Sequence, residues 1–85
     1  MIYKNKEGEI INVKFPKREG KFIIPEFIGD YQCKVIETEE FVSWSELTEV
    51  VIPKSVETIE DRAFYGCERL EKVIIPEGCE KIEAG

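Results

Sequence analysis

The sequence has no histidine among its 85 residues. Catalysis by a Ser-His or Cys-His pair and metal binding through imidazole are therefore excluded. A glycine-rich phosphate loop after a strand is also missing, and no pair of carboxylates occupies an apolar setting suited to acid–base catalysis. We therefore expect a protein that is not an enzyme and that has no cofactor and no metal site.

Long apolar runs are missing as well. No stretch approaches the length needed to span a bilayer, and the start MIYKNKEGEI lacks a basic segment followed by an apolar one. We expect no membrane insertion and no signal peptide, and a cytoplasmic location if the chain is complete. The net charge of −6 weighs against nucleic-acid binding. The cationic segment 14–18 (KFPKR) is the only candidate for phosphate contacts, and the alternative is a solvated turn between two strands.

A repeat dominates the second half of the chain. The segment LTEVVIPKSVETIEDRAFYGCER (47–69) is followed by LEKVIIPEGCEKIEAG (70–85), and the two match when Leu47 is placed on Leu70 and Pro53 on Pro76. A fixed period of roughly 20–50 residues is typical of a solenoid, in which each coil buries its apolar side against its neighbours. The core is predicted to contain Val50, Ile52, Val56, Ile59, Phe64, Leu70, Val73 and Ile75.

The period extends backwards as far as Tyr31. Ile36 takes the place of Ile59 and Ile82, and Phe41 takes that of Phe64. Further upstream the phase breaks, because Pro25 of FIIPE lies further from Pro53 of VVIPK than Pro53 lies from the next proline. We interpret the extra residues as a longer turn at 27–30.

We predict one domain, 1–85, with four parts. Residues 1–30 hold a β-hairpin (strands 2–4 and 9–15) that caps the first coil, and the strand 21–25. Coils follow at 31–46 and 47–69, and an incomplete coil at 70–85. We expect brief helical turns at 37–42 and 60–65, and direct pairing of the strands 47–53 and 70–76.

The three cysteines are an odd number and none lies in a CxxC motif. Cys33 and Cys79 fall in one column of the repeat but two coils apart, roughly 10 Å, whereas a disulfide needs Cα atoms within about 7 Å. We expect three free thiols, the alternative being a redox or metal site.

The segment LTEVVIPKSVETIEDRAFYGCERL resembles the BspA-type leucine-rich repeat, roughly LxxVxIPxSVxxIGxxAFxGCxxL. The resemblance covers about 20–85 closely and the hairpin loosely. It departs from the motif at Glu37, Glu60 and Glu83, which stand where the family has Gly, and at 41–44, where FVSW replaces the AFxGC segment.

The resemblance implies a leucine-rich-repeat solenoid, mainly β with short helical turns and parallel strands. It also implies a non-catalytic protein–protein interaction module, and a bacterial or protist protein at the cell surface or secreted. An alternative is a structural N-terminal capping fragment of a longer surface repeat protein, without a binding role of its own.

Two surfaces are candidates for binding. On the exposed strand face, Glu49 and Lys72 are expected to lie side by side, and Val51 over Ile74 is expected to form an apolar stripe; the alternative is plain β-propensity. The column Glu37, Glu60 and Glu83 is either a solvated ladder or a cation site.

The chain stops at Ala84-Gly85, partway through a coil, so we expect an open strand edge and a possible homodimer about a two-fold axis. The candidate edge comprises Leu70, Glu71, Lys72, Val73, Ile74, Ile75, Cys79 and Ile82.

Overall fold

The computed structural model describes residues 1–79 and 81–82, and for 81–82 the backbone only. Within these residues the chain forms nine short strands and no helix. The strands are β1 (Ile2–Lys4), β2 (Ile10–Asn12), β3 (Gly20–Ile23), β4 (Phe27–Ile28), β5 (Tyr31–Ile36), β6 (Leu47–Val51), β7 (Thr58–Ile59), β8 (Lys72–Ile74) and β9 (Lys81–Ile82).

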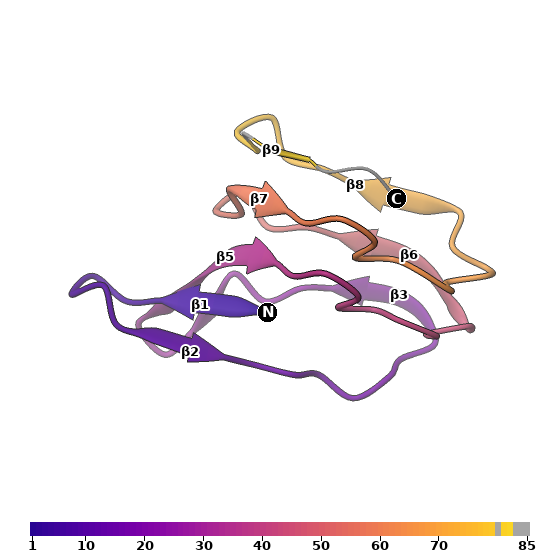
Figure 1. Cartoon of the computed structure of the whole chain (residues 1–85), viewed down its shortest axis with the longest axis horizontal. Helices are drawn as coiled ribbons and strands as arrows, with labels where there is room; N and C mark the ends of the chain where they lie inside the picture. Colours follow the sequence, from indigo (N-terminus) through magenta and orange to yellow (C-terminus); the bar gives the residue numbers. More distant parts are fainter. Residues whose placement is uncertain (80, 83–85) are drawn as a thin grey trace.

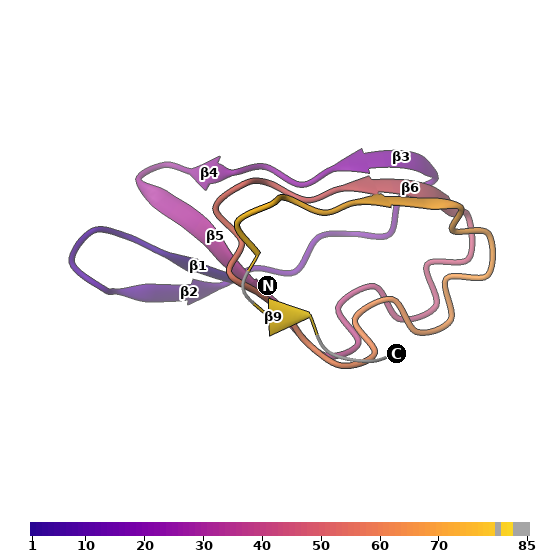
Figure 2. The ribbon, with the colours of Figure 1, turned by 90° about the horizontal axis from the view of Figure 1, so that it is seen from above.

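The strands form two sheets. One has six strands in the order β2-β1-β5-β7-β9, with β4 also on β5, and the other has three in the order β3-β6-β8. Figure 2 shows the chain passing from one sheet to the other within each coil. The predicted pairing of 47–53 with 70–76 is confirmed, because β6 and β8 are parallel with Val50 opposite Val73. The six-stranded sheet is mixed: β5, β7 and β9 are parallel, whereas β1, β2 and β4 join antiparallel.

The repeat period sets the register of β5, β7 and β9. Ile36 lies opposite Ile59, which lies opposite Ile82. Figure 1 shows β5, β7 and β9 one above the other. The upstream phase break is also present, since Val50 pairs with Phe22, which is further away along the chain than its other partner, Val73. The extra residues form a tight hairpin, in which β4 turns back onto β5 through Gly29, whose φ of 61° suits glycine. The longer turn predicted at 27–30 is therefore partly strand.

Strands β1 and β2 form the predicted N-terminal hairpin, but its return strand is shorter than the predicted 9–15, ending at Asn12. Its turn is held by the Asn5 side chain, whose Oδ1 accepts hydrogen bonds from the backbone N–H groups of Glu7 and Glu9. Strand β1 pairs with β5 on the edge opposite β7, with Tyr3 beside Cys33. Tyr3 is fully buried, and its hydroxyl donates to the Pro25 carbonyl at 2.6 Å. The hairpin thus covers the free edge of the first coil.

The expected helical turns are short series of hydrogen-bonded turns and not helices. In the first, the N–H of Glu40 donates to the carbonyl of Glu37, and the N–H of Val42 donates to that of Glu39. Glu39 and Ser43 have positive φ, 58° and 62°, and so does Arg62 in the second turn, at 56°. Left-handed residues interrupt the α-helical hydrogen-bond pattern, so no helix develops.

The core lies between the two sheets. Of the predicted core residues, Val50, Ile52, Val56 and Ile59 are buried, while Phe64, Leu70 and Val73 are half-buried and pack against the core. Ile75 is 42% exposed, so its assignment to the core is wrong. It follows β8, which has a neighbouring strand on one side only in the described part of the chain. An aromatic cluster fills the end near the turns, with Phe41 in contact with Phe22, Trp44 and Phe64.

Candidate functional site

The outer side of the three-stranded sheet carries two regular rows of side chains. Val50 is fully buried, so its neighbours Glu49 and Val51 point outward. The strand register then aligns Lys21, Glu49 and Lys72 in one row, and Ile23, Val51 and Ile74 in the next. We call this surface, defined by those six residues, the outer strand face. It contains all four residues singled out from the sequence.

Two members of the outer strand face, Lys21 and Ile23, were missed by the sequence reasoning. Ile23 is 62% exposed, more than Ile74 at 40%, so it is the most exposed of the apolar row. The repeat period does not reach β3, which is why neither residue was singled out. The signal was present in the alignment of FIIPE with VVIPK, because the shift that superposes the two prolines also places Ile23 over Val51.

On the outer strand face, Glu49 forms its ion pair with Lys21 and not with Lys72. Glu49 and Lys72 are neighbours in register, as predicted, but the Glu49 carboxylate lies 3.8 Å from the Nζ of Lys21. Within the described residues Lys72 forms no ion pair. Exposed ion pairs of this kind contribute little to stability, about 0–1 kcal/mol. Among the described residues, the charged row therefore presents two ammonium groups to a partner: that of Lys21, which is paired with Glu49, and that of Lys72, which forms no ion pair.

Two of the three glutamates in this column, Glu37 and Glu60, contact other groups of the protein. One carboxylate oxygen of Glu37 lies 2.9 Å from the amino group of Met1, and Glu60 accepts a hydrogen bond from the N–H of Thr38. Glu83 lies outside the described residues. In the part that the structure describes, no three Cys, Asp or Glu residues gather in a way that could hold a metal ion.

The three cysteines all lie in the described part of the chain, and no disulfide joins any of them there. Cys33 is fully buried, and burial raises the pKa of its thiol from 9.0 to about 11. Burial also raises the pKa of Cys67, whose Sγ donates to the carbonyl of Phe41 at 3.1 Å. Thiolates are the reactive form of cysteine, so a raised pKa makes Cys33 and Cys67 poor nucleophiles.

The described part of the chain contains no helix with the length and apolarity that crossing a membrane requires.

Residues 22–85 match the family model described as a BspA-type leucine-rich repeat region. The chain belongs to the BspA-type leucine-rich repeat family. No curated protein and no solved structure matches it. The BspA-type region begins at Phe22 in β3, so the whole apolar row of the outer strand face lies within it, while the hairpin β1–β2 precedes it.

Proposed function

We propose that this BspA-type repeat chain is a non-catalytic interaction module, a short solenoid whose outer strand face binds a protein partner. The observation that carries the proposal is the apolar row Ile23, Val51 and Ile74, aligned across three paired strands and exposed at both ends. Apolar side chains that gather on an exposed sheet face are suited to contact with another protein. Repeat regions of this family are generally not enzymes, which is consistent with such a role.

The strands that carry the outer strand face are well anchored in the fold, which supports a binding role for this face. On the inward side of the same strands, Phe22 and Val50 are buried, and backbone hydrogen bonds from Ile24 to Val51 and from Ile52 to Ile74 continue the pairing past the strand ends. A partner therefore meets a surface already in its binding shape, which lowers the entropic cost of association.

A second candidate is a structural capping fragment of a longer repeat protein. The pairing of β1 with β5 favours it, because the hairpin covers an edge strand as a terminal unit of a solenoid must. We propose the same division of the domain as the sequence suggested: a cap and first strand at 1–30, coils at 31–46 and 47–69, and a further coil from 70.

A displayed-peptide selection distinguishes these candidates. Peptides would be selected on the wild-type chain and their affinities compared with those for Ile23→Ser/Ile74→Ser. The matched control is Ile10→Ser/Phe27→Ser, which removes two residues of similar exposure, 58% and 56%, from β2 and β4. We expect the face variant to weaken the selected peptides about tenfold or more, through lost apolar burial, and the control to leave them unchanged. Peptides that bind both variants equally would refute the interaction face and favour the capping role.

A further inference from the structure

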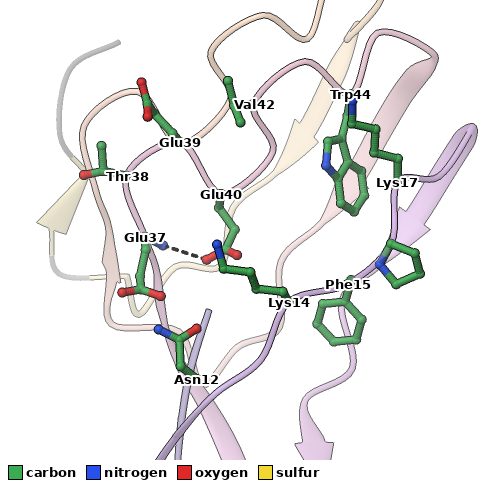
Figure 3. A pocket seen from close by; sticks show the side chains of 11 residues that line it. Asn12, Lys14, Phe15, Lys17, Glu37, Thr38, Glu39, Glu40, Val42 and Trp44 are labelled. Atoms are coloured by element: carbon green, nitrogen blue, oxygen red, sulfur yellow. Dashed lines mark hydrogen bonds between the residues drawn. The ribbon is translucent and has the colours of Figure 1, made fainter.

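A groove lies away from the outer strand face, between the segment 12–17 and the turn 37–44. Its volume is about 500 Å³, within the range of about 300–1,000 Å³ typical of small-molecule sites. Figure 3 shows Phe15, Lys17 and Trp44 on one side, Glu37, Thr38 and Glu39 on the other, and the Lys14 side chain extending toward Glu40. The cationic segment 14–18, considered above only for phosphate contacts, thus forms one wall of the groove.

Trp44 presents an unused hydrogen-bond donor to this groove. The residue is 6% exposed, and its ring is held edge-on by Phe41 at 4.9 Å and tilted against Phe22 at 5.7 Å. Its indole N–H has no acceptor among the described residues, yet the nitrogen is not sealed from solvent. In Figure 3 this nitrogen faces the interior of the groove. Tryptophan N–H groups in buried surroundings usually have an acceptor, so this donor is available to a ligand.

Two ammonium groups flank the same groove. Lys14 and Lys17 are exposed, and within the described part of the chain neither forms an ion pair, whereas Lys21 and Lys34 do. Between them, Phe15 and Pro16 supply an apolar wall. The groove therefore combines two ammonium groups, one directed N–H donor and apolar surface, which are groups that can recognise an organic anion.

The carboxylates of the opposite wall are compensated only in part. The amino group of Met1 lies 2.9 Å from Glu37 and 2.6 Å from Glu40, so these two carboxylates share one cationic partner. Glu40 also accepts a hydrogen bond from the backbone N–H of Glu37. Figure 3 shows the Glu39 carboxylate directed away from Lys14, Lys17 and Trp44.

We propose that this groove binds a small organic carboxylate with a short apolar body. The carboxylate accepts a hydrogen bond from the Trp44 indole and lies near the Lys14 and Lys17 ammonium groups, while the apolar body covers Phe15 and Pro16. A singly charged carboxylate suits the site better than a phosphate dianion, because the donors are few and the neighbouring wall is acidic. The site goes beyond the proposed protein-binding role and does not depend on it.

Trp44 is the only tryptophan in the chain, so its fluorescence reports directly on the groove. Hexanoate, hexanamide and acetate would each be titrated into the full-length protein. We expect a saturable change in emission with hexanoate, a weaker response to acetate, which lacks the apolar body, and none with hexanamide, which lacks the charge. An equal response to hexanamide, or inorganic phosphate competing as well as hexanoate, would overturn the proposal.

Substitutions of the residues that line the groove test whether hexanoate binds there. Lys14→Gln and Lys17→Gln are each expected to weaken hexanoate binding about threefold, and together about tenfold, as for exposed charge pairs. Lys54→Gln is the control, because Lys54 is also exposed but does not line the groove. Trp44→Phe keeps a packed ring but loses the donor, and amide chemical shifts should show about tenfold weaker binding. Unchanged affinity in the double lysine variant would refute the site even if Trp44→Phe fails to fold.

Discussion

Phe64 stacks face to face on Phe41 one coil below, with ring centroids 5.1 Å apart and planes within 5°. Phe41 is fully buried and Phe64 half-buried, so the two rings differ in the apolar area that they remove from water. We expect Phe41→Ala to lower the free energy of unfolding by about 3–5 kcal/mol, and Phe64→Ala by less, about 1–3 kcal/mol. Urea denaturation of both variants measures the difference. Equal losses would show that stacking, not burial, sets the contribution of these rings.

Cys33 and Tyr3 lie side by side in the core, and burial raises the pKa of both above their ordinary values. For Cys33 the pKa rises from 9.0 to about 11, so between these values the unfolded chain loses the thiol proton while the folded chain retains it. Stability is therefore fully present below pH 9 and is lost as the pH rises towards 11, by up to about 1.4 kcal/mol per pH unit for each such group. Unfolding midpoints measured across this range should fall. The fall should be smaller in Cys33→Ala, and identical slopes in the two proteins would contradict the assignment to Cys33.

At the scale of elements, β8 and the residue after it carry exposed apolar side chains at a strand edge. It pairs with β6 on one side only in the described part of the chain, and Ile74 and Ile75 are 40% and 42% exposed. Self-association through residues 70–85 remains a prediction, since such an edge can pair with a second copy. Ile82 belongs to β9, but its side chain lies outside the described residues.

Sedimentation velocity over a series of concentrations tests the β8 edge. The wild-type chain should form a dimer, and Ile74→Lys should shift it towards monomer by placing a charge at the contact. Ile23→Lys is the matched control, because Ile23 lies on the same face in β3, at the opposite edge of the sheet. A wild-type chain that stays monomeric at every concentration would rule out this association.

At the scale of the whole molecule, two sheets enclose one core and the hairpin closes one end of it. The outer strand face belongs to the three-stranded sheet, whereas the groove lies where the segment after the hairpin meets the first turn. The two surfaces are formed by different residues, so a ligand at one leaves the other free.

The sequence by itself determined the family, the pairing of β6 with β8, the register of Ile36 with Ile59 and the stack of Phe41 with Phe64. Each follows from the repeat period, because stacked coils must keep apolar side chains in the same column to bury them. Four of the six residues of the outer strand face could be predicted for the same reason.

The tertiary structure decided the rest. Lys21 and Ile23 join the face only through a register longer than the repeat period, which the β4–β5 hairpin makes possible. The turns are not helical because Glu39, Ser43 and Arg62 adopt positive φ, which local propensity disfavours. The groove brings together the segment 12–17 and the turn 37–44, which are distant in the sequence and share no repeat position. Their approach depends on the path of the whole chain around its core, which no local pattern contains.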